Sequence, residues 1–306
     1  MLVDKPFMCY NYFGDYMICH LCPRNCNALR SDSEGKGFCK MGLMPKVARI
    51  APHMWEEPCI SGTKGSGTVF FSGCTLRCVF CQNYEISKKN YGKIITPQKL
   101  SDEFKKLENQ GVHNINLVSP TPFIPAILEA FEIYKPKIPV VYNCGGYEKV
   151  ETIRLLDGIV DIYLPDFKYS DNTLAKMYSF AENYVETTQA AITEMIRQTG
   201  NPVFNNDGII EKGTIIRHLI LPNHTKNSIN VLNILNNIYS NGNNFLVSLM
   251  GQYVPLGKAD EFSKLNRKIT QREYEKVKNH LFQLDIDGFV QDLSSASDEY
   301  VPTWDF

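Results

Sequence analysis

The chain has 306 residues and a formal net charge of −1, and 43% of its residues are hydrophobic and 21% charged. That length is sufficient for one large or two medium domains with a sizeable core, and the composition is that of an ordinary globular protein. The near-zero charge argues against a broad electrostatic contact with nucleic acid, and no apolar run approaches the length of a membrane span. We therefore expect neither a membrane protein nor a protein that binds nucleic acid through a broad basic surface.

The start of the chain and its cysteines indicate the compartment. Residues 1–10, MLVDKPFMCY, lack the basic-then-apolar order of a signal peptide, so we expect a cytoplasmic protein. In a reducing compartment the ten cysteines are poor candidates for disulfides and good candidates for metal ligands. Seven of them fall in two groups, at residues 19–39 and 74–81, which strengthens the metal interpretation.

The sequence divides into regions that differ in composition and periodicity. Residues 1–65 are rich in cysteine, glycine, proline and charge, with little periodicity, and are predicted to form a loop-rich N-terminal extension. Strand and helix patterns alternate over residues 66–290, which we expect to form the main domain, and residues 291–306 are predicted to be an irregular tail.

Short apolar runs with β-branched residues mark six candidate strands. They span residues 68–72, 114–119, 138–143, 159–164, 214–221 and 244–250. Apolar residues at helical spacing lie between and after these runs, along 100–107, 123–134, 185–196, 232–238 and 274–284. Thr96-Pro97 predicts the start of the first helix, and Thr270 with Glu273 predicts a capping box at the start of the last.

The alternation of strands and helices predicts an α/β fold with parallel strands and right-handed crossovers. Six units are fewer than the eight of a closed barrel, so we expect a partial (β/α)6 barrel preceded by the cysteine-rich, loop-rich extension. A doubly wound sheet is the alternative. In both architectures functional residues lie at the carboxyl ends of the strands.

Three cysteines follow the first candidate strand directly, in the order Cys74-x3-Cys78-x2-Cys81. A structural zinc site with a distant fourth ligand is one interpretation, but zinc sites usually contain paired Cys-x2-Cys or Cys/His motifs. A [4Fe-4S] cluster held by three thiolates fits the spacing better, because it leaves one iron open to a ligand from outside the protein.

This motif, with Phe80 as an aromatic residue before the third cysteine, resembles the signature of the radical S-adenosylmethionine (SAM) superfamily. Residues 65–83 are similar to the cluster region of pyruvate formate-lyase activating enzymes and their uncharacterised relatives, residues 53–62 resemble the corresponding segment of that uncharacterised group, and matching features extend to residues 249–258. The resemblance implies a partial barrel of the radical SAM type, in which SAM binds the open iron through its amino and carboxylate groups.

The resemblance also implies an activity. An electron from flavodoxin or ferredoxin passes through the cluster to SAM, which breaks into methionine and a 5′-deoxyadenosyl radical, and that radical abstracts a hydrogen atom from the substrate. The first hypothesis is an activase, whose substrate is a glycine of a glycyl radical enzyme. The alternatives are a radical SAM enzyme acting on another peptide, a metabolite or RNA, and a non-catalytic iron–sulfur scaffold.

Polar residues at the ends of the second and third candidate strands are possible SAM contacts. Ser119 and Thr121 stand where family members commonly carry a Gly-Gly-Glu-like segment that holds the amino group, and this sequence departs from that pattern. They are equally well explained as a helix N-cap beside proline. The resemblance places Asn143 where activating enzymes carry an acidic residue, and a turn containing asparagine is the alternative.

Charged residues follow the fourth candidate strand and lie within the fifth. Asp166 and Lys168 look like the Asp-x-Lys motif of the activating enzymes, and alternation sends both side chains to one side. Lys168 suits the carboxylate of SAM, with a surface ion pair as the alternative. Arg217 lies in an apolar strand and needs a partner if buried, so we expect it to bind an anion, whereas His218 faces the other way and is structural.

The N-terminal extension contains a second group of cysteines, Cys19, Cys22, Cys26 and Cys39. Four thiolates suffice for a tetrahedral zinc or for a second iron–sulfur cluster, and His20 is an alternative ligand. Because an aperiodic segment needs a staple to stay folded, we expect a metal here rather than free thiols.

Overall fold

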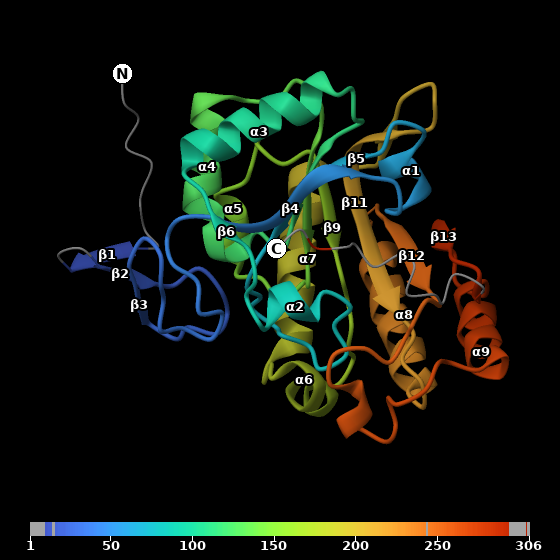
Figure 1. Cartoon of the computed structure of the whole chain (residues 1–306). Coiled ribbons are helices and arrows are strands. Elements are labelled where there is room, and N and C mark those ends of the chain that lie inside the picture. The colour runs from blue at the N-terminus through green and yellow to red at the C-terminus, as the bar shows by residue number, and fades with distance from the viewer. Residues whose placement is uncertain (1–9, 14–15, 243, 294–303, 305–306) are drawn as a thin grey trace.

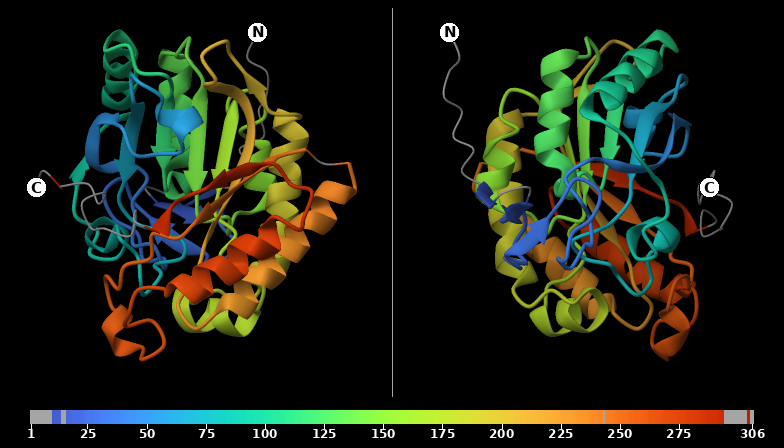
Figure 2. Two further views of the ribbon diagram at one scale, coloured as in Figure 1. Left: turned by 90° about the vertical axis from the view of Figure 1, so that its right-hand side faces the viewer. Right: turned by 60° about the vertical axis from the view of Figure 1, so that its left-hand side comes forward.

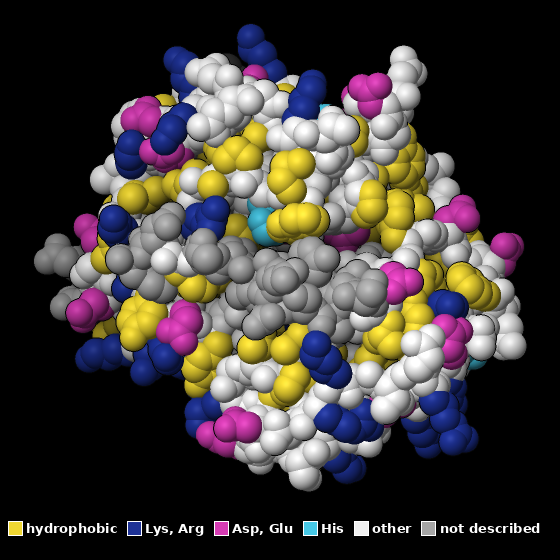
Figure 3. All heavy atoms as spheres, turned by 45° about the vertical axis from the view of Figure 1, so that its right-hand side comes forward, with side chains coloured by type: hydrophobic (Ala, Val, Ile, Leu, Met, Phe, Trp, Pro, Cys, Tyr) yellow, Lys and Arg dark blue, Asp and Glu magenta, His cyan; other side chains and the backbone are white. Residues whose placement is uncertain are grey.

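The computed structural model of the chain describes residues 10–13, 16–242, 244–293 and 304, so most of the predicted tail at 291–306 lies outside the described residues. In these ranges no helix is both long and apolar enough to cross a bilayer. Figure 3 shows basic and acidic side chains interspersed around one face, with hydrophobic side chains between them.

Parallel strands that neighbour one another in chain order form most of a large sheet (Figure 1). They are β5 (Ser66–Phe71), β7 (Ile115–Val118), β8 (Val140–Cys144), β9 (Ile162–Pro165), β11 (Ile210–Leu219), β12 (Leu246–Met250) and β13 (Gly288–Val290). All six predicted strands are confirmed, with shifted ends. Their order never reverses, whereas a doubly wound sheet has a point at which it does. The fold is therefore a partial barrel.

The edge beside β5 was not predicted. There β4 (Lys46–His53) pairs antiparallel with β5, and β6 (Lys93–Ile94) pairs with β4. A short β10 (Val203–Phe204) pairs antiparallel with β11. The large sheet thus includes residues 46–53, which the sequence analysis assigns to the extension. Only two residues of β4 are buried, and its charged residues and proline conceal an edge strand from a search for apolar runs.

Helices connect the parallel strands and pack beside one another, α3 with α4, α5 with α7 and α8 with α9. The longer ones are α3 (Pro97–Asn109), α4 (Ile124–Ile133), α5 (Val150–Arg154), α6 (Asn172–Ser179), α7 (Tyr184–Thr199), α8 (Thr225–Ser240) and α9 (Gln271–Leu281). Shorter turns are α1 (Pro58–Ser61), α2 (Tyr84–Ser87), η1 (Thr121–Phe123) and η2 (Ala259–Glu261). Figure 2 shows α8 and α9 side by side against the sheet.

The sequence signals for helix starts are confirmed. Thr96 Oγ1 accepts a hydrogen bond from the Lys99 amide at 3.1 Å, and Thr270 with Glu273 forms the predicted capping box. The apolar faces of the helices bury against the sheet, and Phe104 of α3 stacks on Phe131 of α4 at a centroid distance of 5.0 Å. Burial of these faces is what holds the strands in a curve around the site.

The N-terminal region is a separate three-stranded antiparallel sheet of β1 (Tyr10–Phe13), β2 (Tyr16–Cys19) and β3 (Ala28–Arg30), at the left of Figure 1. Arg30 fixes it to the barrel, because its buried guanidinium donates to the carbonyl oxygens of Met41 at 2.9 Å and Pro122 at 2.7 Å. The Thr152 hydroxyl adds a hydrogen bond to the Leu21 carbonyl at 2.9 Å. The cysteine-rich segment is therefore packed onto the barrel.

Candidate active site

A cavity lies at the carboxyl ends of the parallel strands. Nine of the residues singled out in the sequence analysis line it: Cys74, Cys78, Phe80, Cys81, Ser119, Asn143, Asp166, Lys168 and Arg217. Apolar side chains complete the wall, among them Leu76, Val118, Leu219 and Met250. The folded chain thus brings together residues from five separate segments of the sequence.

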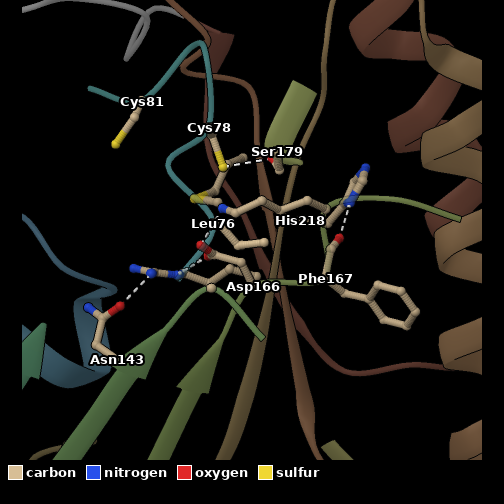
Figure 4. A network of polar contacts seen from close by, with 12 residues as sticks. Leu76, Cys78, Cys81, Asn143, Asp166, Phe167, Ser179 and His218 are labelled. Atoms are coloured by element: carbon tan, nitrogen blue, oxygen red, sulfur yellow. Dashed lines mark hydrogen bonds and ion pairs between the residues drawn. The ribbon is translucent and has the colours of Figure 1, made fainter. Parts of the chain in front are cut away.

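The three cysteines lie on the loop between β5 and α2, and each sulfur accepts a hydrogen bond. Ser179 Oγ donates to Cys78 at 2.9 Å, Ser87 Oγ donates to Cys81 at 3.4 Å, and the Leu76 amide donates to Cys74 at 3.4 Å. Figure 4 shows Ser179 directed at Cys78. Donors aimed at sulfur stabilise the thiolate, which is the form that binds a metal.

Burial sets the proton affinity of these thiols. It raises the pKa of Cys78, which Lys168 partly offsets, and it raises the pKa of Cys81 to about 12 with the help of the Cys78 and Cys74 thiols. Protonated thiols are poor ligands, but a bound metal cation competes with the proton and offsets the cost of burying a thiolate. Buried thiolates repel one another, and a strongly cationic centre would stabilise them.

The loop geometry depends on two backbone positions. Gly73 has a φ of +79°, and an added Cβ would meet the Met41 side chain at 2.4 Å, so this position needs glycine. Arg77 is left-handed with a φ of 56°, and its guanidinium donates to the Phe38 carbonyl at 3.0 Å and the Lys88 carbonyl at 3.1 Å. These contacts fold the loop so that Cys74 and Cys78 face the cavity.

The thiol arrangement is compatible with a cluster. Among the described residues, no group of three or more His, Cys, Asp or Glu side chains is arranged to hold a metal ion. The cysteine ligands of an iron–sulfur cluster bind different iron atoms and need not converge on one point. The residues present therefore fit a cubane cluster with three protein thiolates.

Opposite the cysteines, the guanidinium of Arg217 joins three segments of the chain. Nε donates to Asp166 at 2.9 Å, Nη1 to Glu56 at 3.2 Å and Nη2 to Asn143 at 2.6 Å (Figure 4 draws the contact with Asn143). Lys168 pairs with the other oxygen of Asp166, as the predicted alternation requires. Burial alone would raise the pKa of Asp166, but Arg217 and Lys168 outweigh it and hold that pKa below its usual value.

Two residues near this network were not predicted. Glu56, between β4 and α1, accepts hydrogen bonds from Asn116 at 3.1 Å and Asn143 at 3.3 Å, besides its ion pair with Arg217. Ser179, at the end of α6, holds Cys78. The two adjacent glutamates before Pro58 could have indicated Glu56 as a site residue. No feature of the local sequence distinguishes Ser179 from other serines at helix ends.

Thr121 is the predicted contact that does not line the cavity. Its hydroxyl donates to Glu148 Oε1 at 2.8 Å inside the protein, and burial raises the pKa of Glu148 to about 8. Ser119 does line the cavity, in a left-handed conformation with a φ of 58°. Phe80 packs on Tyr253 at a centroid distance of 5.9 Å.

His218 faces away from the cavity, as predicted, and Figure 4 shows it directed at Phe167. Its Nδ1 lies 2.6 Å from the Phe167 carbonyl oxygen, and burial lowers its pKa to about 4. The imidazole is therefore neutral near pH 7, which suits a structural role.

The N-terminal cysteines are electrostatic neighbours. Burial raises the pKa of Cys22, and Cys19 and Cys39 add to that increase; burial also raises the pKa of Cys39, with contributions from Cys19 and Cys26. In the described part of the chain, no three of these or other possible ligands are arranged to hold a metal ion. The structure thus places the four thiols in one region.

Arg24 links this region to the three-cysteine loop. Its backbone lowers the pKa of the Cys22 thiol, and its side chain donates to the Thr75 carbonyl at 2.8 Å and the Ser179 carbonyl at 2.8 Å. Thr75 follows Cys74 in the chain, and Ser179 is the residue that holds Cys78. The two groups of cysteines are therefore connected through one side chain.

Comparisons with known proteins give the family. A protein-family profile described as "Radical SAM superfamily" matches residues 68–232. An uncharacterised protein of Methanocaldococcus jannaschii, MJ0674, is 33% identical over 268 residues, which are 85% of this chain and 72% of that protein.

Solved structures of low sequence identity are also similar. Streptococcus suis SuiB bound to its precursor peptide SuiA is 14% identical with a TM-score of 0.47, over 73% of this chain and 48% of that one. A domain of pyruvate-formate lyase-activating enzyme from Bacteroides vulgatus is 12% identical with a TM-score of 0.36, over 64% of this chain and 91% of that one. This chain thus spans about half the length of SuiB. On the match of the superfamily profile to more than half its length, the chain belongs to the radical SAM superfamily.

Proposed function

We propose that this protein binds SAM in the cavity beside Cys74, Cys78 and Cys81 and acts on a second molecule by hydrogen-atom abstraction. Cleavage of SAM at a [4Fe-4S] cluster is the general reaction of the superfamily, and the cluster supplies both the electron and an open iron. The observation that carries the proposal is the placement of these cysteines opposite a partly buried network of complementary charges.

The protein's own groups bind and orient SAM. Lys168, which lowers the pKa of Cys78 and is held by Asp166, places a cation beside the cysteines and suits the SAM carboxylate. Asn143 and Asp166 supply polar atoms for the ribose hydroxyls, and the apolar wall with Phe80 suits adenine. Holding the reacting groups in a cavity away from bulk water favours the productive geometry.

We propose that the hydrogen atom comes from a glycine of a partner protein, a glycyl radical enzyme, and that flavodoxin or ferredoxin supplies the electron. The likeness of residues 65–83 and 249–258 to activating enzymes supports this choice. Abstraction from another peptide, a metabolite or RNA is the alternative.

Cys78 provides the first test. After anaerobic reconstitution with iron and sulfide, the wild-type protein should release 5′-deoxyadenosine from SAM when dithionite is added. Cys78→Ala should reduce that release to background, because the cluster loses one of three ligands. Cys59→Ala is the matched control, since Cys59 is buried in α1 away from the cavity. Wild-type levels of 5′-deoxyadenosine from Cys78→Ala would refute the ligand assignment.

The choice of substrate has its own test. Each candidate glycyl radical enzyme from the same genome is incubated with the reduced protein and SAM, and electron paramagnetic resonance is recorded. A glycyl radical doublet is expected on one partner, and it should disappear when its radical-loop glycine is replaced with alanine. If all candidates stay silent while 5′-deoxyadenosine accumulates, the substrate belongs to another class.

We also propose that Cys19, Cys22, Cys26 and Cys39 hold a second metal centre. Their proximity and their link to the first loop through Arg24 support it. Cys22→Ala should lose the metal of this centre and keep that of the first, as measured by iron, sulfide and zinc analysis against Cys59→Ala. Which element disappears identifies the centre as iron–sulfur or zinc. An unchanged metal content would show that the four thiols are free.

A further inference from the structure

A second cavity adjoins the SAM cavity on the side of the segment between β4 and α1. Asn143, Arg217 and Gln252 line both cavities, so the two are direct neighbours. The second cavity adds Glu57 and Trp55 to the lining, and neither takes part in the proposed binding of SAM. A group bound there would lie next to the reacting centre.

Glu57 is one of three residues lining the second cavity whose acceptor oxygens have no partner among the described residues, the others being Asn83 and Gln291. Glu57 is only 4% exposed, and its Oε2 forms no hydrogen bond of normal geometry among the described residues, although the nearby Ser248 hydroxyl lowers the Glu57 pKa. The neighbouring Glu56 differs, because Asn116, Asn143 and Arg217 all donate to it. A buried carboxylate oxygen without a donor is costly, so Glu57 is set up to accept from a ligand.

The charges around the junction are unequal. Three carboxyl groups, those of Glu56, Glu57 and Asp166, share two cations, Arg217 and Lys168. Burial raises the pKa of Glu56 and Glu57, and Arg217 opposes that shift in both. With both glutamates ionised the set has one excess negative charge, which a bound cation would balance, whereas protonation of one glutamate would balance it without a ligand.

Aromatic side chains surround the same space. Trp55 is 62% exposed and lines the cavity together with Phe70 and His53, whose rings lie 5.7 Å apart. Aromatic faces attract guanidinium and ammonium groups, and a carboxylate accepts strong hydrogen bonds from both. The lining therefore suits a nitrogen cation that carries N–H donors.

We propose that the second cavity is a substrate subsite for a guanidinium or ammonium group, which donates to the Glu57 carboxyl group while the hydrogen to be abstracted faces the SAM cavity. The inference rests on the proposed function for the position of the reacting centre, but the recognition of a cation is separate from SAM chemistry. The substrate class thus carries a positive charge near its reactive carbon–hydrogen bond.

The test uses three probes and the reconstituted, SAM-loaded protein. Nα-acetylarginine amide carries a guanidinium group and Nα-acetyllysine amide carries an ammonium group. Nα-acetylcitrulline amide is an uncharged analogue of the arginine probe. Equilibrium dialysis with radiolabelled probes gives each Kd. At least one cationic probe should bind about tenfold or more tightly than citrulline amide, since a hydrogen bond to a charged group gains at least that factor. Which cationic probe binds tells guanidinium from ammonium.

Glu57→Gln should lower the ratio of the Kd for citrulline amide to the Kd for the cationic probe by a factor on the order of ten. Citrulline amide is the reference probe for each protein. Glu151→Gln, at an exposed glutamate of α5, is the matched control and should keep the preference. Equal binding of charged and uncharged probes to the wild type would overturn the inference, and so would an unchanged preference in Glu57→Gln. If Glu57→Gln does not fold, the wild-type comparison decides alone.

The two proposals fail separately. A protein that releases 5′-deoxyadenosine but shows no preference for cationic probes would refute the subsite and leave the SAM reaction standing. A protein that prefers cationic probes but never cleaves SAM would refute the proposed function and leave a cation-binding cavity.

Discussion

The partly buried guanidinium of Arg217 forms the interaction on which the site depends. It donates to Asp166 after β9, Asn143 on β8 and Glu56 before α1, and so joins the strand ends to a segment outside the parallel barrel. Removing one partner from a buried ion pair typically costs about 3–5 kcal/mol, because the remaining charge is left uncompensated. Asp166 in turn holds Lys168 beside Cys78, so the positions of the charges and of the cysteines are coupled.

The parts of the fold that depend on local sequence could be predicted. The six apolar strands, the Thr270 capping box and the cysteine spacing are each visible in a few consecutive residues. Arg217 was expected to bind an anion because a charge in an apolar strand needs a partner, and its partners proved to be carboxylates of the protein itself. The prediction that the side chains of Asp166 and Lys168 point to the same side followed from strand alternation alone.

The remainder required the tertiary structure. Glu56 and Glu57 belong to a short segment with no periodicity, and their burial arises only when that segment packs over the strand ends. Thr121 was placed at the site by its position after a strand, but a buried glutamate 27 residues later takes its hydroxyl. The contact of Arg24 with Thr75 and Ser179 joins residues that are 51 and 155 positions apart, a distance at which no sequence pattern acts.

The most direct test of the site is the electronic response of its cluster to SAM. The reconstituted protein is reduced with dithionite, and its electron paramagnetic resonance spectrum is recorded with and without SAM. A change in the g values of the cluster signal is expected, because SAM binds the iron that the three thiolates leave open. A spectrum unchanged at saturating SAM would contradict binding at the cluster and with it the central claim.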